Sequence, residues 1–212
     1  MNNSLYVQYG CGPDKSCSPE TWLNFDASPT LRLARLPMVG KLLTRSRVTF
    51  SNHVKYGDIV TGLPIPHGSC SGIYCSHVLE HLSLSDFRLA LKNTYDLLIS
   101  KGIFRLVVPD LEAFAKKYVE SNDPKAAEQF MYSTLLGIEN RPRKLLDFLE
   151  FWLGNHNHLW MWDFKSLNYE LASIGFVEIR KYEFGDFSVP TFKDVEKFDR
   201  FIDAIAIECR KP

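Results

Sequence analysis

Short strand-like runs alternate with helical segments along this chain, and this alternation is the feature that most constrains its fold. The runs are rich in β-branched and aromatic residues and are bounded by glycine, proline or aspartate, as buried strands are. Strands that alternate with helices form a mostly parallel sheet covered on both faces. The sequence therefore predicts an α/β fold with strands at 5–9, 21–25, 54–56, 72–76, 103–108, 176–182 and 202–209.

Two helices between these runs have recognisable ends. The first begins after Ser83, which has an aspartate three residues on in the spacing of a capping box, and Gly102 is its expected stop. The second begins at Asp163 or Ser166 and ends at Gly175. The apolar stripe of the first helix has helical spacing and consists of Phe87, Leu91, Tyr95 and Leu98.

Two segments stand outside the alternation. Residues 30–50 carry five basic side chains and no acid, which fits either a solvated helix face or a peripheral contact with anionic membrane lipid or a phosphorylated acceptor. Residues 111–153 form a helical insert, in which Asp123 and Pro124 have the pattern of an N-cap and a first-turn proline. Because ligands bind at the carboxyl ends of parallel strands, we predict that this insert forms a lid there.

Composition limits the class of protein. The chain has 212 residues, enough for one domain with an insert, and its zero net charge gives no sign of a nucleic-acid partner. Its five cysteines include no CxxC pair, which fits a reducing cytosol better than a disulfide framework or a zinc ribbon. No signal peptide and no apolar run of ~20 residues is visible. We expect one cytoplasmic domain over 1–212, of undetermined oligomeric state.

The first strand, ending at Tyr9, runs into Gly10-Cys11-Gly12. Glycine lacks a Cβ and tolerates positive φ, so the backbone can approach a ligand closely here, although an ordinary glycine turn has the same pattern. The dinucleotide fingerprint needs a third glycine where Lys15 stands, which argues against a nicotinamide oxidoreductase. Cys11 has no obvious base beside it and is interpreted as a small hydrophobe rather than a nucleophile.

Acids follow the next two strands. Asp26 ends the second strand, where a carboxylate can accept hydrogen bonds from both hydroxyls of a ribose. Asp58 follows the third strand and can accept from an adenine amino group while Ile59 packs on the ring. Each acid alone is more typical of a loop or a cap. Together with the turn at Gly10 they outline a nucleoside site.

The run from 63 to 82 resembles a known family. It reads LPIPHGSCSGIYCSHVLEHL and closely resembles the LPFPDGSFDxIYxSHVLEHL block of class I, type 11 S-adenosylmethionine-dependent methyltransferases. The segments 10–12, 22–26, 99–105, 162–167 and 175–176 are similar to other motifs of that family. The resemblance implies a Rossmann-like methyltransferase fold with an antiparallel last strand, and S-adenosylmethionine as cofactor. With the nucleoside site outlined above, the cofactor-binding residues that we expect are Tyr9, Gly10, Cys11, Gly12, Asp26, Asp58, Ile59, Ser76 and His77.

The sequence departs from the family pattern in three places. Only about ten residues separate Gly12 from the second strand, too few for the usual helix. This shortening is familiar in a subgroup of small predicted methyltransferases that is often linked with surface-polysaccharide synthesis. His67 stands where aspartate is usual, and Cys70 and Ser71 replace a Phe-Asp pair. The last two departures lie on the approach loop, where we expect little effect on cofactor binding.

The sequence offers three candidate bases. His156 and His158 would project to one face of an extended chain, and a neutral histidine is suited to accept a hydroxyl proton. His77 is the third candidate, and Glu80 and His81 share its face if the segment is helical. Loop or packing roles are the alternatives, and His81 is expected to be structural. A His-x-His pair alone does not make a metal site, and no nearby carboxylate–histidine set completes it, so no metal is predicted.

The predicted function is methyl transfer to a small-molecule acceptor, with a sugar hydroxyl in surface-polysaccharide synthesis as the expected kind. A non-catalytic S-adenosylmethionine-binding partner module is the alternative. A cluster of aromatic residues either walls the acceptor pocket or packs in the core: Phe148, Phe151, Trp152, Trp160 and Trp162.

Overall fold

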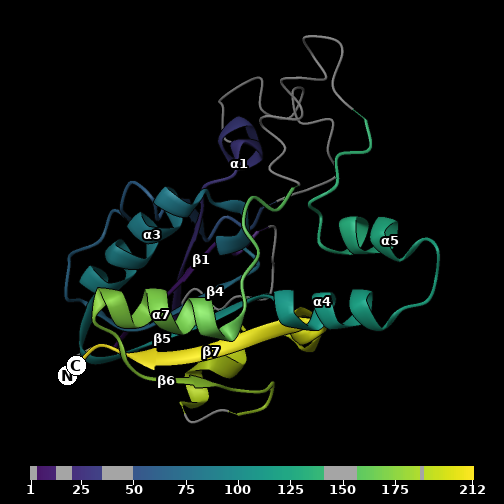
Figure 1. Cartoon of the computed structure of the whole chain (residues 1–212). Helices are drawn as coiled ribbons and strands as arrows, with labels where there is room; N and C mark the ends of the chain where they lie inside the picture. The colour runs from purple at the N-terminus through teal and green to yellow at the C-terminus, as the bar shows by residue number, and fades with distance from the viewer. Residues whose placement is uncertain (1–3, 13–20, 35–49, 141–156, 187–188) are drawn as a thin grey trace.

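The computed structural model describes residues 4–12, 21–34, 50–140, 157–186 and 189–212 (Figure 1). Its centre is a seven-stranded sheet in the order β3-β2-β1-β4-β5-β7-β6. The strands are β1 (Leu5–Tyr9), β2 (Trp22–Asp26), β3 (Val54–Tyr56), β4 (Cys70–Ser76), β5 (Leu98–Pro109), β6 (Val177–Lys181) and β7 (Ala204–Arg210).

The strand directions confirm the predicted sheet. Strands β1 to β5 run parallel to one another, and β7 is antiparallel to both β5 and β6. The order reverses at β1, because β2 and β3 lie on one side of it and β4 and β5 on the other. Loops leaving the carboxyl ends of β1 and β4 therefore diverge, which opens a crevice at that edge.

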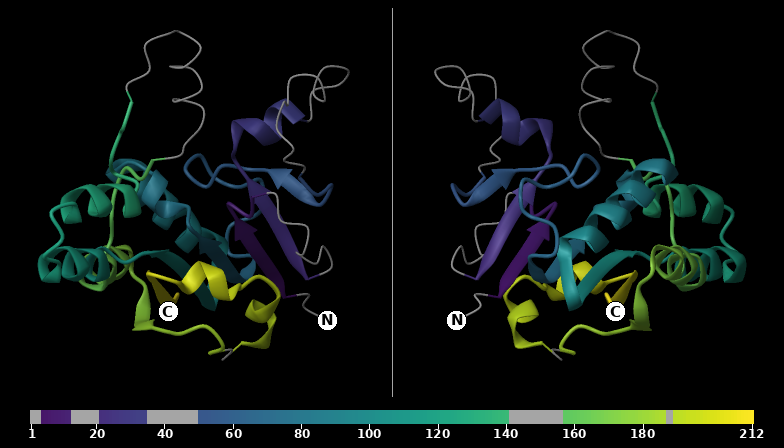
Figure 2. Two further views of the ribbon diagram at one scale, coloured as in Figure 1. Left: turned by 90° about the vertical axis from the view of Figure 1, so that its right-hand side faces the viewer. Right: turned by 90° about the vertical axis from the view of Figure 1, so that its left-hand side faces the viewer.

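The two faces of the sheet are covered differently. Helices α3 (Leu84–Leu97) and α7 (Phe164–Ile174) pack on one face of the sheet (Figures 1 and 2). The apolar side chains of the two helices and alternate residues of β4 and β5 form the larger core cluster there. The opposite face holds a smaller cluster, which the 3-10 turns η2 (Pro190–Asp194) and η3 (Phe198–Phe201) cover. The other helical elements are α1 (Pro29–Ala34), η1 (Leu79–His81), α4 (Leu111–Glu120) and α5 (Ala126–Ser133).

The ends of the two central helices follow the sequence signals, with one correction. Helix α7 has the capping box of Asp163 with Ser166, and Gly175 ends it at φ +111°. Ser83 caps α3 as predicted. However, α3 ends at Leu97 rather than at Gly102, because Leu98 is already extended and pairs with β4. The apolar spacing predicted that Leu98 belongs to the helix, but its pairing with β4 places it in β5.

The insert after β5 contains α4 and α5. The prediction that a helix begins at Asp123 and Pro124 is wrong by two residues, because the Asp123 carboxylate accepts from Lys125 N at 2.8 Å and closes a turn. Helix α5 then begins at Ala126. Within the described residues, no helix is long and apolar enough to cross a membrane.

Several sequence predictions lie outside the described residues. They include the short link with Lys15, most of the basic stretch 30–50, the end of the insert, and His156 beyond it. Of the basic side chains, Arg32 on α1 is described and lies over the Tyr56 ring at 4.2 Å. Four cysteines among the described residues are buried thiols: Cys11, Cys70, Cys75 and Cys209. Burial raises the pKa of Cys70 to about 11.

A buried ion cluster joins β5 and β7 on the face covered by η2. Arg105 is fully buried, and its guanidinium donates to Glu208 at 2.7 Å and to Glu196 at 2.8 Å. The same group lies over the rings of Tyr182 and Phe192. Because one cation serves two buried carboxylates, removing it would leave Glu196 without this counterion, whereas Glu208 would keep its ion pair with Arg180 at 2.9 Å.

We expect Arg105→Met to lower the free energy of unfolding by about 3–5 kcal/mol, the cost of breaking a buried ion pair from one side. Urea denaturation measures this change. The matched control is Lys92→Met on α3, which removes an exposed ion pair with Asp96 and should cost less than about 1 kcal/mol. Equal losses for the two variants would contradict the structural role assigned to Arg105.

Candidate functional site

Two residues with positive φ mark the crevice between β1 and β4. Gly10 follows β1 at φ +66°, and His77 follows β4 at φ +54°. A non-glycine residue in the left-handed region is uncommon, and such residues cluster at active sites and ligand clamps. A cavity of about 550 Å³, here called the nucleoside cavity, opens between them. Its lining includes Tyr9, Gly10, Asp26, Asp58, Ile59, His77, His81, Asp86 and Leu159.

The glycine turn is shaped by close packing at its first residue. A Cβ at Gly10 would lie 2.1 Å from the Cγ2 of Val78, whereas a Cβ at Gly12 would meet nothing within 4 Å. Cys11 between them is buried against Leu31 and Val54, which agrees with its interpretation as a small hydrophobe. Gly10 thus sets how closely β1 and the residues after β4 approach.

Asp26 ties the turn to the end of β2. Its two carboxylate oxygens accept hydrogen bonds from Gly12 N at 2.9 Å and from Ser28 N at 2.8 Å. The side chain is buried but lines the nucleoside cavity. Since a carboxylate has about four acceptor sites, lone pairs remain for two ligand hydroxyls.

Asp58 and Ile59 form the far wall of this cavity. The Oδ1 of Asp58 accepts from Val60 N at 2.9 Å, which fixes the carboxylate at the cavity. Ile59 is buried, and Asn93 on α3 holds its carbonyl at 2.8 Å. The two residues therefore present a carboxylate and an apolar surface side by side.

Three of the remaining predicted cofactor residues do not line this cavity, and a fourth lines it without offering its hydroxyl. Cys11, Gly12 and Ser76 are not among its lining residues. Tyr9 lines it but directs its hydroxyl into the core, 3.3 Å from the Oγ1 of Thr94. Burial raises the pKa of Tyr9 well above its ordinary value, so the phenol stays protonated.

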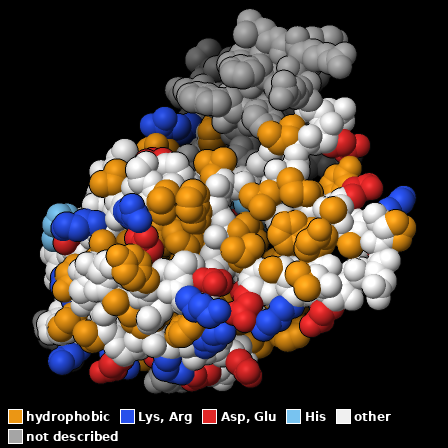
Figure 3. Space-filling view, viewed as in Figure 1, with side chains coloured by type: hydrophobic (Ala, Val, Ile, Leu, Met, Phe, Trp, Pro, Cys, Tyr) orange, Lys and Arg blue, Asp and Glu red, His pale blue; other side chains and the backbone are white. Residues whose placement is uncertain are grey.

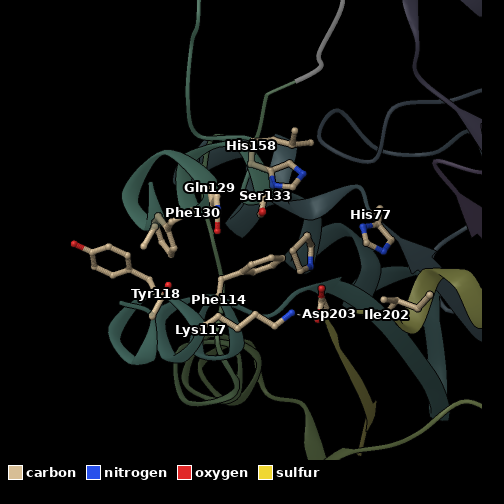
Figure 4. Close-up of a pocket in the computed structure, with 14 residues that line it drawn as sticks. His77, Phe114, Lys117, Tyr118, Gln129, Phe130, Ser133, His158, Ile202 and Asp203 are labelled. Atoms are coloured by element: carbon tan, nitrogen blue, oxygen red, sulfur yellow. Dashed lines mark hydrogen bonds and ion pairs between the residues drawn. The ribbon is translucent and has the colours of Figure 1, made fainter. Parts of the chain in front are cut away.

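A second cavity of about 450 Å³ lies under the insert (Figure 4). Rings from α4 and α5, those of Phe114, Tyr118 and Phe130, form one side of it. Lys117 reaches across the opening and binds Asp203 at 2.6 Å. Hydrophobic side chains also gather over α4 and α5 on the outer surface (Figure 3). This space, here called the acceptor cavity, is also lined by His77, Gln129, Ser133 and His158.

His77 lines both cavities, and its ring is held from both sides. Its Nε2 donates to the carbonyl oxygen of Arg200 at 2.9 Å, and its Nδ1 lies 3.3 Å from the Oε1 of Glu80. Burial alone would lower the pKa of His77, but the Glu80 carboxylate and the Arg200 carbonyl outweigh it and raise that pKa above its usual value.

His158 meets the residues after β4. Its Nε2 lies 4.0 Å from the Oε1 of Glu80, and its ring contacts that of His81 with centroids 4.9 Å apart. Burial lowers the pKa of His158, so the ring is neutral at neutral pH. The sequence predicted that no carboxylate and histidine lie near His158, and this prediction is wrong, because Glu80 and His81 lie beside it in the folded chain. Both residues belong to η1.

The aromatic cluster does not wall the acceptor cavity within the described residues. Trp162 is buried in the core and stacks on Phe87 with centroids 4.0 Å apart. Trp160 is 42% exposed and lines neither cavity. Core packing is thus the correct alternative for Trp162. The other three aromatic residues fall outside the described residues.

Sequence reasoning missed most of the acceptor cavity. Lys117 and Asp203 lie far apart in the chain and meet only because α4 follows β5 while Asp203 precedes the adjacent β7. No local pattern marks either residue as part of a site. Helices α4 and α5 after β5 border this cavity, which also reaches His77.

The fold matches solved structures of S-adenosylmethionine-dependent methyltransferases. One such protein from Thermotoga maritima, described as a possible histamine N-methyltransferase, has a TM-score of 0.52 at 15% identity and covers 98% of this chain and 82% of that one. The methyltransferase SibL in its apo form has a TM-score of 0.51 at 13% identity, covering 99% of this chain and 50% of that one.

PigF, solved with SAH, also has a TM-score of 0.51, at 14% identity, over 99% of this chain and 56% of that one. This chain thus spans about half the length of PigF and of SibL. No family model and no curated protein sequence matches it. At these identities the shared property is the fold.

We expect Gly10→Ala to be more destabilising than Gly12→Ala. Both residues have positive φ, so both substitutions strain the backbone. Only the Gly10 variant must also displace Val78, which adds about 1–3 kcal/mol of overpacking. Urea denaturation of the two variants separates these effects, and a smaller loss for Gly10→Ala than for Gly12→Ala would contradict the close contact.

Proposed function

We propose that the chain binds S-adenosylmethionine in the nucleoside cavity and transfers its methyl group to a hydroxyl of a small molecule in the acceptor cavity. The observation that carries this proposal is the shared wall of the two cavities at His77. A donor and an acceptor bound on either side of that residue would meet at the carboxyl end of β4, in a fold known from S-adenosylmethionine-dependent methyltransferases.

The nucleoside cavity has the chemistry that S-adenosylmethionine requires. Asp26 would accept from the ribose hydroxyls, and Asp58 from the adenine amino group, with Ile59 against the ring. Asp86 adds a further acid to the lining. Because the sulfonium and the amino group of the cofactor are positively charged, an acidic cavity with an apolar wall favours it electrostatically.

The acceptor cavity is suited to a compact polyhydroxy compound. Aromatic faces at Phe114 and Phe130 can pack against a sugar ring, while Gln129 and the pair of Lys117 with Asp203 can bind its hydroxyls. A sugar of surface-polysaccharide synthesis is our proposed substrate class, because the subgroup with the same short link after Gly12 is often linked with that synthesis. We propose that the insert acts as a lid over the acceptor cavity and that the reaction takes place in the cytoplasm.

The reaction would be an in-line displacement at the sulfonium methyl group. Alignment of donor and acceptor contributes up to about 7–11 kcal/mol to such reactions. A base that removes the hydroxyl proton adds roughly 10²–10⁴-fold. His77 and His158 line the acceptor cavity and are our candidates, together with His156 from the sequence. Both described rings lie against Glu80, which would stabilise the imidazolium that forms.

Cofactor binding can be tested at Asp26. We expect Asp26→Asn to weaken binding of S-adenosylhomocysteine at least about tenfold, because the variant loses the charge and part of the acceptor capacity that the ribose requires. Isothermal titration calorimetry measures the affinity, and a thermal melt confirms that the variant is folded. Asp123→Asn is the matched control, since Asp123 also holds a turn but lies at the exposed start of α5. Unchanged affinity in the Asp26 variant would exclude this ribose site.

Methyl transfer is the second test. We expect label from methyl-labelled S-adenosylmethionine to pass to a member of a panel of nucleotide-linked and lipid-linked sugars. Phe114→Ala should lower kcat/KM for that sugar about tenfold by removing an aromatic wall, with cofactor affinity unchanged. Tight binding of S-adenosylhomocysteine without transfer to any acceptor would instead favour the non-catalytic partner module.

A further inference from the structure

The carboxylate of Glu80 lies in the wall between the two cavities, and its surroundings are unusual. The side chain is fully buried at η1, yet neither of its oxygens receives a hydrogen bond of acceptable geometry from the described residues. The nearest nitrogens belong to His77, at 3.3 Å, and to His158, at 4.0 Å. A buried carboxylate that lacks hydrogen bonds is strongly unfavourable unless a cation compensates it.

Ring nitrogens of two histidines lie near this carboxylate. The Nδ1 of His81 lies 3.0 Å from the carbonyl oxygen of Asn157, so Nδ1 carries the proton and Nε2 carries the lone pair. Histidines that bind metals typically donate their second N–H to a carbonyl or carboxylate in this way. The Nε2 of His158 is the atom that faces Glu80.

These groups have the spacing of a metal site. One ligand atom from each of Glu80, His81 and His158 lies within 4.8 Å of the others. Ligand atoms around a tetrahedral zinc ion with bonds of ~2.1 Å are roughly 3.4 Å apart. Small rotations of the side chains would therefore bring all three into contact with one ion.

We propose that Glu80, His81 and His158 bind a divalent transition metal ion such as Zn²⁺, Co²⁺, Fe²⁺ or Mn²⁺. Two imidazoles and one carboxylate form a ligand set that these ions accept, whereas Mg²⁺ and Ca²⁺ prefer oxygen ligands. Three protein ligands leave coordination positions open, as in catalytic sites. His77 stays outside the set, as the partner of Glu80 in the metal-free protein.

The position of the site suggests its use, and this part of the inference rests on the proposed function. His158 lines the acceptor cavity and His81 lines the nucleoside cavity, so the ion would lie where acceptor and methyl donor meet. An acceptor hydroxyl bound to the ion would lose its proton to bulk water more readily. Its oxygen would then form the bond to the methyl carbon while the carbon–sulfur bond breaks, with that electron pair remaining on sulfur as S-adenosylhomocysteine.

Co²⁺ tests the site without an assay of activity. The full chain, stripped of metal with a chelator, should bind one equivalent of Co²⁺ with the intense visible absorption of a four- or five-coordinate ion, and Mg²⁺ should not displace it. Glu80→Gln and His158→Asn should each weaken Co²⁺ binding at least ~100-fold, more than the loss of an outer-sphere partner. His67→Asn, which changes an exposed histidine of the approach loop, should bind like the wild type.

Glu80→Gln keeps the shape of the side chain and removes its buried charge, so thermal melts should show a folded variant that Zn²⁺ no longer stabilises. Acetohydroxamate, which chelates metals through two oxygens, should change the Co²⁺ spectrum if coordination positions are open. An unchanged spectrum would overturn the acceptor-binding role. The absence of saturable Co²⁺ binding in the wild type, or equal binding by wild type and both ligand variants, would overturn the site itself.

Calorimetry with S-adenosylhomocysteine separates this inference from the proposed function. If S-adenosylhomocysteine binds but Co²⁺ does not, the metal site is wrong and the proposed function stands. If Co²⁺ binds through Glu80 and His158 but S-adenosylhomocysteine does not bind, the metal site stands and the proposed function is wrong.

Discussion

The arrangement of both cavities depends on Glu80, the middle residue of η1. Its backbone carbonyl accepts hydrogen bonds from Leu159 N at 2.8 Å and from Trp160 N at 3.1 Å, which fixes the segment before α7 against the end of β4. Its side chain lies against His77 and His158. One residue therefore joins three parts of the chain, and the wall between the two cavities follows from that junction.

The sheet places this junction at the edge where ligands bind. Strands β1 and β4 are parallel neighbours with Tyr9 opposite Cys75, so Gly10 and His77 leave the sheet within one residue of each other, both with positive φ. Close packing of Gly10 on Val78 keeps the two chain segments together. On the sheet face covered by η2, the buried guanidinium of Arg105 in β5 binds Glu208 of β7 and Glu196. The strands of the sheet thus hold in place the residues that follow β1 and β4.

Local signals in the sequence predicted most of the fold. Short apolar runs gave the seven strands to within a few residues at most ends, and the caps of α7 were predicted from Asp163, Ser166 and Gly175. The early start of β5 was not predicted, because pairing of Leu98 with Cys70 is a tertiary effect that helical periodicity does not contain. The acids after β2 and β3 were predicted to share one cavity, and they do, because parallel strands bring their carboxyl ends together.

Contacts between distant segments account for what the sequence could not predict. The approach of His158 to Glu80 depends on two backbone hydrogen bonds between the segment before α7 and η1. The pairing of Lys117 with Asp203 depends on the antiparallel return of β7 beside β5. Neither pair has a sequence spacing that signals contact. Each therefore became visible only in the folded chain.

The central claim is that the crevice between β1 and β4 holds the methyl donor next to His77. A crystal structure of the full chain grown with S-adenosylhomocysteine tests it most directly. We predict that the ribose hydroxyls lie within hydrogen-bond distance of the Asp26 carboxylate, the adenine beside Asp58 and Ile59, and the sulfur toward His77 and the acceptor cavity. S-adenosylhomocysteine bound elsewhere, or bound with its sulfur directed away from the acceptor cavity, would contradict the account.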